Sequence, residues 1–272
     1  MTMENNKMRV AVIQMHSGED KKENLRSAVR LLHKAISRKA QFILLPEIFN
    51  FRGRPSSASR NAETIPGETI KVIADIASRK KVYILAGSIY ERAGAGNKFY
   101  NSSVLIDDRG AIQAIYRKMH LFDVHVQGRT VRESKILLQG RRPVLTSVAG
   151  VKIGLSICYD LRFPELCRAY SKAGAQLLCV PSCFTYATGQ AHWEILLRAR
   201  AIENQCFVAA PNQCGAGAGV LPAYGNSMII DPWGRIMARA SSDKPEVIDA
   251  ELDFRKQAAS RKDFPALKHR RL

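Results

Sequence analysis

The sequence predicts an α/β protein, in which buried strands alternate with amphipathic helices. Short apolar runs such as residues 42–46 (FILLP) and 176–181 (QLLCVP) are separated by segments whose apolar residues recur at helical spacing. Continuous apolar strands of this kind are typical of sheets covered by helices. The 272 residues are 46% hydrophobic and 24% charged, as in ordinary globular proteins, and no Pro/Ser-rich linker divides them. We therefore expect one domain over residues 1–272.

The first third of the chain predicts two strand–helix–strand units. The helices are recognised by apolar residues on one face, and the strands by short apolar runs between polar loops. In chain order we expect a strand at 8–15, a helix at 21–36, a strand at 42–46, a helix at 66–81 and a strand at 82–91.

The next elements are two hairpins. Residues 102–118 read as alternating strands around Asp108-Arg109-Gly110, and residues 144–158 as strands around a turn at Gly150. The remaining elements return to the alternation of helices and strands. We expect a helix at 163–174, a strand at 176–181, a helix at 192–205, a strand at 206–211, and short strands at 227–231, 234–239 and 247–252. From Asp253 to residue 272 we expect a helix and a basic tail that contact a partner subunit.

The formal net charge is +18, from 42 Lys and Arg against 24 Asp and Glu. The surplus is spread along the chain without a tract of five or six like charges, and no zinc-finger, RNP or repeat signature accompanies it. The longest apolar runs are far below the roughly 20 residues of a membrane-spanning helix. The beginning of the sequence lacks the pattern of a secretory signal, so we expect a cytoplasmic protein. The six cysteines contain no CxxC pair, which predicts thiols rather than disulfides or structural zinc.

Three residues with ionisable or nucleophilic side chains lie at the ends of buried strands: Glu47, Lys118 and Cys158. Taken alone, Glu47 is more typical of a helix-start or surface carboxylate, and Cys158 of an inert core thiol. Together they form a reactive set. Glu47 can remove the thiol proton, Cys158 can attack a carbonyl carbon, and Lys118 can stabilise the negative charge that develops there.

Histidine competes for the role of base. His120, His125 and His192 are available, so residue spacing alone leaves a Cys/His hydrolase open.

Longer segments around the three residues resemble the signature segments of the nitrilase superfamily, the carbon–nitrogen hydrolases. These are LLPEIFN around Glu47, YRKMHLFDV around Lys118 and SICYDLRFPEL around Cys158, in the order that the family uses. The similarity continues through PSCFTYATGQAHWEILLRARAIENQ and YGNSMIIDPWG, so that it covers approximately residues 8–252. The resemblance implies a four-layer α-β-β-α sandwich whose subunits pair through the helices that follow the Cys and Glu strands.

The resemblance also implies a mechanism and further site residues. Cys158 is expected as nucleophile, Glu47 as general base, and Lys118 with the Tyr159 backbone N–H as oxyanion site. The segment RESKILLQG resembles the family stretch with a second glutamate, which places Glu133 near Lys118. No metal or organic cofactor is required, because side chains and backbone supply all the chemistry.

Within the superfamily the sequence is most similar to the omega-amidase and deaminated-glutathione amidase branch. There, the arginine four positions after the nucleophile binds a substrate carboxylate; in this chain it is Arg162, and the alternative is an ion pair with Asp160 or Glu165. Phe184 and Thr188 fall where related amidases line the substrate pocket.

One position departs from the omega-amidase pattern. Those enzymes carry a tyrosine six residues after the glutamate, where this chain has Gly53 between Arg52 and Arg54. The two arginines would suit an anionic substrate if they face inward, or else lie in solvent. The sequence thus predicts hydrolysis of a small, carboxylate-bearing linear amide to an acid and ammonia. Nitrilase, N-carbamoyl amide hydrolase and a non-catalytic basic interaction protein remain as alternatives.

Overall fold

Two six-stranded sheets form the centre of the protein. The computed structural model describes residues 6–94, 96–126, 128–217 and 219–271. In spatial order, the first sheet contains β16 (Glu246–Asp253), β1 (Lys7–Gln14), β2 (Phe42–Leu44), β3 (Tyr83–Arg92), β4 (Phe99–Ile106) and β5 (Ile112–Arg117). The second contains β15 (Ile236–Arg239), β14 (Met228–Ile230), β11 (Phe207–Ala210), β10 (Leu177–Cys179), β9 (Val151–Leu155) and β8 (Val144–Val148).

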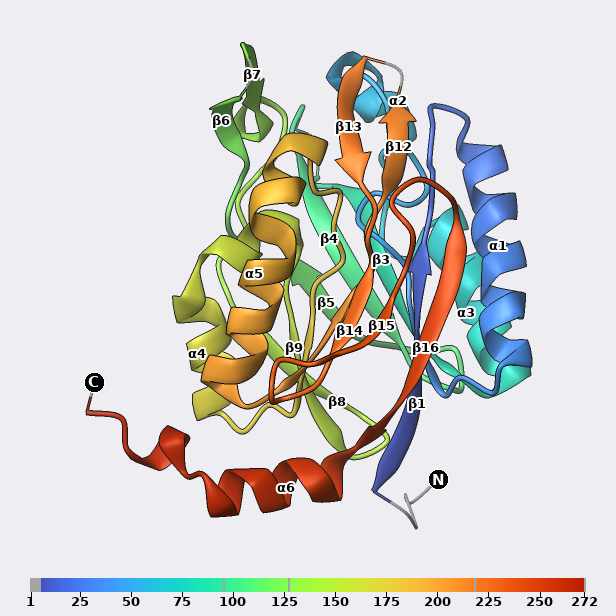
Figure 1. Ribbon diagram of the computed structural model, residues 1–272. Coiled ribbons are helices and arrows are strands. Elements are labelled where there is room, and N and C mark those ends of the chain that lie inside the picture. The colour runs from blue at the N-terminus through green and yellow to red at the C-terminus, as the bar shows by residue number, and fades with distance from the viewer. Residues whose placement is uncertain (1–5, 95, 127, 218, 272) are drawn as a thin grey trace.

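Helices cover the outer faces of both sheets. The helices α1 (Lys21–Ser37) and α3 (Glu68–Lys80) lie on one side in Figure 1, and α4 (Pro164–Lys172) and α5 (Tyr186–Asn204) lie on the other. Side chains of β1 alternate between two cores: Val10 and Val12 pack toward the second sheet, whereas Ala11 and Ile13 pack toward α1 and α3. The expected four-layer α-β-β-α sandwich is confirmed.

The predicted hairpins are present. Asp107 closes the turn between β4 and β5, since its carboxylate accepts hydrogen bonds from the Arg109 N–H (2.9 Å) and the Ala111 N–H (2.8 Å). The turn between β8 and β9 contains Ala149 and Gly150, which both have positive φ angles (46° and 85°).

Helix α5 begins at Tyr186, six residues before the predicted start at residue 192. Residues 186–191 (YATGQA) lack apolar periodicity, so nothing in their pattern predicts a helix. This first part of α5 packs against β13, where Gly189 lies so close to the Tyr224 side chain that a Cβ atom would overlap it.

Several short elements escape the sequence prediction. They are the hairpins β6 (Asp123–Val126) with β7 (Arg129–Arg132) and β12 (Cys214–Gly217) with β13 (Val220–Tyr224), the helix α2 (Ala58–Asn61), and the 3₁₀ turns η1 (Pro55–Ser57), η2 (Glu133–Lys135), η3 (Cys158–Arg162) and η4 (Ala266–Lys268). Both hairpins and α2 project from the same end of the molecule in Figure 1.

The C-terminal helix α6 (Phe254–Asp263) packs on its own chain. The Phe254 ring meets that of Phe207 edge to face at 5.4 Å, and Gln257 Nε2 donates to the carbonyls of Gln176 (2.8 Å) and Gln205 (2.9 Å). The partner contact expected for this tail stays a prediction. Across the described ranges, no helix is both long and apolar enough to span a bilayer.

Candidate active site

A cavity of about 700 Å³ brings the predicted site residues together. Glu47 follows β2 and Lys118 follows β5 in the first sheet, whereas Cys158 follows β9 in the second. Strand ends of both sheets therefore meet at one wall, as is usual for ligand sites of α/β folds. The predicted residues that line the cavity are Glu47, Lys118, Glu133, Cys158, Tyr159, Arg162, Phe184 and Thr188.

Cys158 occupies a strained turn. It is the first residue of η3, its φ angle is +49°, and its N–H donates to the Pro181 carbonyl (2.9 Å). A left-handed conformation is costly for a residue other than glycine and is often found at functional sites. The Tyr159 N–H lies in the first turn of η3, where backbone donors have no intrahelical acceptor. This turn can therefore present an N–H group to an oxyanion.

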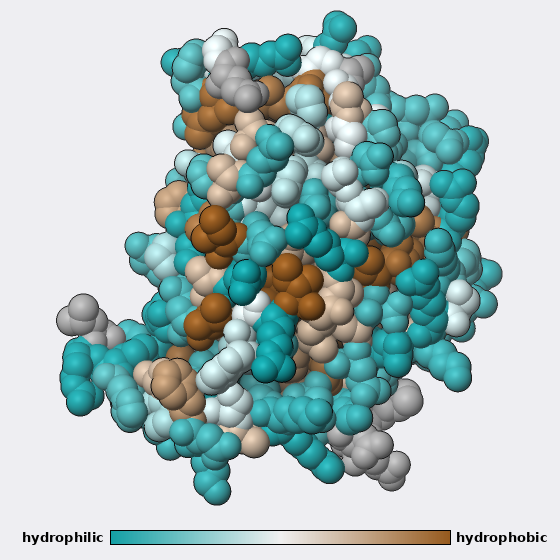
Figure 2. Space-filling model, in the orientation of Figure 1, coloured by the Kyte–Doolittle hydropathy of each residue, from teal (hydrophilic) through white to brown (hydrophobic). Residues whose placement is uncertain are grey.

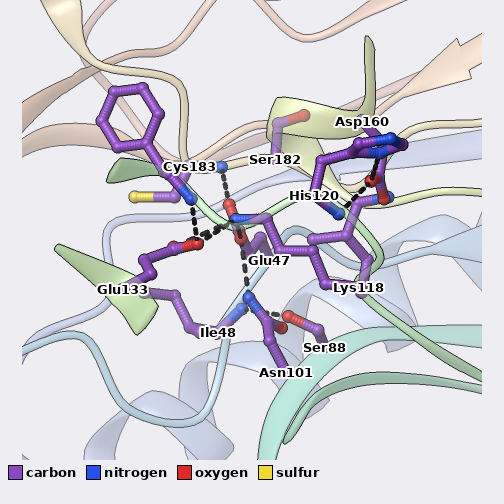
Figure 3. A network of polar contacts seen from close by, with 12 residues as sticks. Glu47, Ile48, Ser88, Asn101, Lys118, His120, Glu133, Asp160, Ser182 and Cys183 are labelled. Carbon is purple, nitrogen blue, oxygen red and sulfur yellow. Dashed lines mark hydrogen bonds and ion pairs between the residues drawn. The ribbon is translucent and has the colours of Figure 1, made fainter. Parts of the chain in front are cut away.

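Glu47 is the centre of a buried hydrogen-bond network (Figure 3). Its Oε1 accepts from Lys118 Nζ (3.0 Å) and Asn101 Nδ2 (2.8 Å), and its Oε2 accepts from the Cys183 N–H (2.7 Å). The following residue, Ile48, has a φ angle of +47° and donates its N–H to Ser88 Oγ (2.9 Å). The carboxylate is thus held in one orientation by donors from several elements.

Lys118 links the two glutamates of the cavity. Its Nζ lies 3.0 Å from Glu133 Oε1 and 2.9 Å from Glu133 Oε2, and the Phe122 N–H also donates to Glu133 Oε2 (2.8 Å). Burial opposes the charged form of Lys118, but the carboxylates of Glu133 and Glu47 outweigh it and raise its pKa well above the ordinary value. Burial raises the pKa of Glu133, against the opposing effect of Lys118. Lys118 therefore remains an ammonium ion at neutral pH.

The Cys158 thiol is protonated at rest. Burial and the nearby Glu47 carboxylate raise its pKa well above the ordinary value, although Lys118 partly opposes this shift. A protonated thiol needs a base at the moment of attack. Both cavity glutamates bond to Lys118, and Glu47 is the one whose charge raises the pKa of the Cys158 thiol.

None of the three candidate histidines lines the cavity. His120 Nδ1 lies 2.7 Å from Asp160 Oδ1 and its ring stacks on Phe163 at 3.7 Å; His125 Nδ1 pairs with Thr130 Oγ1 (2.9 Å) on the β6–β7 hairpin. His192 Nδ1 contacts Arg162 instead (3.2 Å). A Cys/His arrangement is therefore disfavoured. Within the described part of the chain, no three His, Cys, Asp or Glu side chains are grouped to hold a metal ion.

Asp160 joins the turn of Cys158 to the segment of Lys118. It is fully buried, and its carboxylate accepts from the Ile157 N–H (2.8 Å), Tyr116 Oη (2.7 Å) and the His120 N–H (3.0 Å). These donors come from both sheets. Asp160 therefore fixes the position of η3 relative to the end of β5.

Arg162 makes neither of the ion pairs considered from the sequence. Its Cζ lies 5.1 Å from the centre of the Phe184 ring and 5.8 Å from that of Tyr159, and no described carboxylate lies within 4 Å of it. Thr188 Oγ1 pairs with Thr185 Oγ1 (2.7 Å) in the same wall. The guanidinium is thus supported by aromatic rings and is available to an anion.

Asn101, Cys183 and Arg52 also line the cavity, and sequence reasoning assigned no site role to the first two. Asn101 is a buried amide that is followed in β4 by two buried serines, Ser102 and Ser103, and this polar run within a strand could have marked the segment as functional. Cys183 contributes to the network through its backbone N–H, which no side-chain pattern reveals.

Comparisons with known proteins agree with this geometry. A model of the family described as carbon-nitrogen hydrolase matches residues 9–262. A deaminated glutathione amidase from Synechocystis is 42% identical over 264 residues, which are 96% of this chain and 97% of that protein. The nitrilase and fragile histidine triad fusion protein NitFhit of Drosophila melanogaster is 41% identical over 96% of this chain, but the chain spans only 57% of that fusion protein.

Solved structures are similar as well. Saccharomyces cerevisiae Nit3, a nitrilase-superfamily member, superposes with a TM-score of 0.89 at 31% identity, over 98% of this chain and 97% of its own. A variant of the amidase from Nesterenkonia sp. AN1 has a TM-score of 0.83 at 26% identity, over 100% of this chain and 96% of its own. It carries the acetamide moiety of fluoroacetamide covalently on its active-site cysteine.

Proposed function

The chain is a carbon–nitrogen hydrolase of the nitrilase superfamily, and from this premise we propose that it hydrolyses a small, linear, carboxylate-bearing amide to an acid and ammonia. The observation that carries the proposal is the common cavity wall of Glu47, Lys118 and Cys158. The relatives named as amidases support the amide as the bond that is cleaved.

In the first half-reaction Cys158 Sγ attacks the amide carbon while Glu47 accepts the thiol proton. The raised pKa of Cys158 supports this concerted transfer, because little thiolate exists at rest. The carbonyl oxygen becomes an oxyanion, which the Lys118 ammonium and the Tyr159 N–H stabilise. Glu47 then returns the proton to the nitrogen, the C–N bond breaks, and ammonia leaves behind a thioester on Cys158.

In the second half-reaction water attacks the thioester carbon and Glu47 accepts a water proton. The second tetrahedral intermediate uses the same oxyanion donors. Its collapse breaks the C–S bond and returns the proton to sulfur, which releases the acid. Glu133 keeps Lys118 charged and directed into the cavity throughout. The cysteine adduct of the Nesterenkonia amidase supports a nucleophilic role for the corresponding thiol.

The substrate carboxylate is assigned to Arg162. Its guanidinium lines the cavity without a carboxylate partner among the described residues, and Phe184 supports its face. Guanidinium is well suited to a planar carboxylate.

Three compounds with one carboxylate and similar length test the reaction class: succinamate, 3-cyanopropanoate and N-carbamoyl-β-alanine. We expect succinamate to give the highest kcat/KM, with one ammonia released per succinate formed. A preference for the nitrile or the carbamoyl compound would reassign the reaction. Inertness toward all three with an intact fold would overturn the hydrolase mechanism.

A homodimer, or a higher homo-oligomer, is part of the proposal. The large exposed apolar side chains include Ile195 (69% exposed) and Ile202 (51%) on α5, and Trp233, which meets Phe264 edge to face at 6.1 Å. Figure 2 shows hydrophobic groups among hydrophilic ones on the face that Figure 1 assigns to α5, β14 and β15. Such a face on a second-sheet helix suits a symmetric contact between two copies.

A reducing compartment such as the cytoplasm also belongs to the proposal. All six cysteines are free thiols, and the nucleophile must stay reduced to react.

A further inference from the structure

The cavity wall carries a surplus of positive charge. Its two carboxylates, Glu47 and Glu133, both bond to Lys118. The wall cations are Arg52, Lys118, Arg129, Arg132, Lys135 and Arg162. In the described ranges, none of these except Lys118 has a carboxylate within 4 Å. One substrate carboxylate at Arg162 would leave most of this charge uncompensated.

Arg52 is the most deeply buried of these unpaired cations. It is 1% exposed, and its guanidinium is fixed by backbone carbonyls of the β12–β13 hairpin. Nη1 donates to the Cys214 carbonyl (3.2 Å), and Nη2 donates to those of Gly215 (3.1 Å) and Leu221 (2.8 Å). Nε is buried and has no hydrogen-bond partner within the described chain.

The carbonyl contacts satisfy N–H groups but do not neutralise the charge. A buried cation without a counter-ion is costly, because carbonyl dipoles replace only part of its hydration. An anion in the adjoining cavity would supply the missing negative charge. Since the carbonyls already fix the guanidinium, binding would order few additional rotamers.

Arg52 and Arg162 belong to different parts of the wall. Arg52 lies in the loop after Glu47, and its side chain contacts the Cys183 thiol, where its charge and a hydrogen bond oppose the burial-induced rise in the pKa of that thiol. Arg162 ends the turn that begins with Cys158 and sits against Phe184. The two cations thus reach the cavity wall from different segments, the loop after Glu47 and the turn that begins with Cys158.

The residue beside Arg52 has no room for a side chain. Gly53 also lines the cavity, and a Cβ atom there would lie 2.5 Å from Glu19 Cγ and 2.9 Å from Phe51 Cζ. A side chain at this position is therefore excluded unless its neighbours move.

We propose that Arg52 is a second anion-recognition residue of the cavity, so that the preferred substrate carries two anionic groups, one facing Arg162 and one facing Arg52. The assignment rests on the proposed function for the role of Arg162. It explains why a fully buried guanidinium without a carboxylate partner forms part of the wall.

A titration with dicarboxylates, which mimic the two anionic groups of the proposed substrate, tests this proposal without turnover. The probes are the straight-chain dicarboxylates from malonate to adipate and the monocarboxylates with the same numbers of carbon atoms. Dissociation constants are measured by ligand-observed NMR on the Cys158→Ala protein at constant ionic strength. We expect one dicarboxylate to bind about tenfold or more tightly than its matched monocarboxylate, the gain typical of one charge-assisted contact.

Variants at Arg52 separate recognition from support of the hairpin. Arg52→Gln should reduce the dicarboxylate preference to about twofold and leave monocarboxylate affinity unchanged. Arg52→Lys keeps the charge and should retain part of the preference. Arg54→Gln is the matched control, since Arg54 is exposed on the same loop and does not line this cavity.

Two results would overturn the proposal. In one, the Cys158→Ala protein, which retains Arg52, binds dicarboxylates of every length no better than monocarboxylates. In the other, Arg52→Gln weakens the binding of dicarboxylates and of monocarboxylates equally, which would leave Arg52 as a support of the β12–β13 hairpin. The titration measures binding to a protein without the nucleophile, so its outcome does not depend on catalysis. Failure of succinamate turnover would instead count against the hydrolase mechanism.

Discussion

Lys118 organises the charges of the site at the level of single residues. It is 1% exposed and donates hydrogen bonds to both glutamates of the cavity. Its pKa is raised in the folded protein, so its ion pairs stabilise the fold fully below the unfolded pKa of about 10.5 and are lost only as pH rises through the folded value. The proposed oxyanion site is therefore charged over the whole neutral range.

Replacing Glu133 by glutamine should move the alkaline limit of activity to lower pH. The change removes one of the two carboxylates that raise the Lys118 pKa, and burial then favours the neutral amine. The measurement is the pH profile of kcat/KM for succinamate from pH 6 to 10.5. Glu165→Gln, at an exposed position of α4, is the control. An alkaline limb that stays in place would contradict the link between Glu133 and Lys118.

Cys158→Ala should abolish turnover with little loss of stability. The thiol lines the cavity, so its removal opens no void in the core. Activity and thermal unfolding are measured together. Cys167→Ala offers the opposite case, because Cys167 is a buried core residue of α4 outside the cavity; it should lower Tm while turnover persists. Retained turnover in Cys158→Ala would assign the nucleophile elsewhere.

Arg162→Ala should raise KM for succinamate by roughly 10- to 100-fold, the loss expected for a charge-assisted carboxylate contact. Butyramide, which has no carboxylate, should be hydrolysed with unchanged KM. Steady-state kinetics with the two substrates decide the matter. Equal effects on both would give Arg162 a structural role through Phe184 and His192.

At the level of elements, the site depends on the junction between η3 and the end of β5. Asp160 in η3 accepts hydrogen bonds from Tyr116 and His120, which flank Lys118. The carboxylate thereby couples the position of Cys158, the proposed nucleophile, to that of the Lys118 ammonium. Neither element is long enough to set this relation alone.

Asp160→Asn should destabilise the protein and reduce kcat. An amide NH₂ replaces one acceptor oxygen, and buried donors lose their partner at a cost of about 2–3 kcal/mol. Tyr116→Phe removes one of the same hydrogen bonds and should cost about 1 kcal/mol. Denaturant unfolding and kcat are measured for both variants. If Asp160→Asn were no less stable than Tyr116→Phe, the carboxylate would not be the junction.

The elements that sequence patterns predicted are those with strong periodicity, such as β1, α1 and α3. The β12–β13 hairpin was not predicted, because residues 215–219 (GAGAG) show no alternation of apolar and polar side chains. Its structure depends on a partner distant in sequence, since Arg52 binds the carbonyls of Cys214, Gly215 and Leu221. Local propensity contains no information about such a contact.

At the level of the whole molecule, the residues that give the net charge of +18 are spread along the sequence and form no continuous basic tract. In the structure, part of this charge lines the cavity wall, where Arg52, Arg162 and their neighbours outnumber the carboxylates. This distribution favours a small acidic ligand over nucleic acid.

The chain should sediment at twice its own mass. The double variant Ile195→Asp/Ile202→Asp places charges on the exposed apolar face of α5 and should yield monomers. Sedimentation velocity measures both proteins. Lys71→Asp, on the exposed side of α3, should leave the dimer intact. A wild-type monomer would refute this interface.

The sequence was sufficient to predict the α/β class, the order of the main elements and the grouping of Glu47, Lys118 and Cys158, because apolar periodicity and short signature segments are local properties. It could not reveal that Asn101 and the Cys183 N–H hold Glu47, or that Arg52 is buried in the cavity wall. Those features arise where strand ends of two sheets and two irregular hairpins meet. Such contacts join residues as much as 169 positions apart, so only packing in three dimensions determines them.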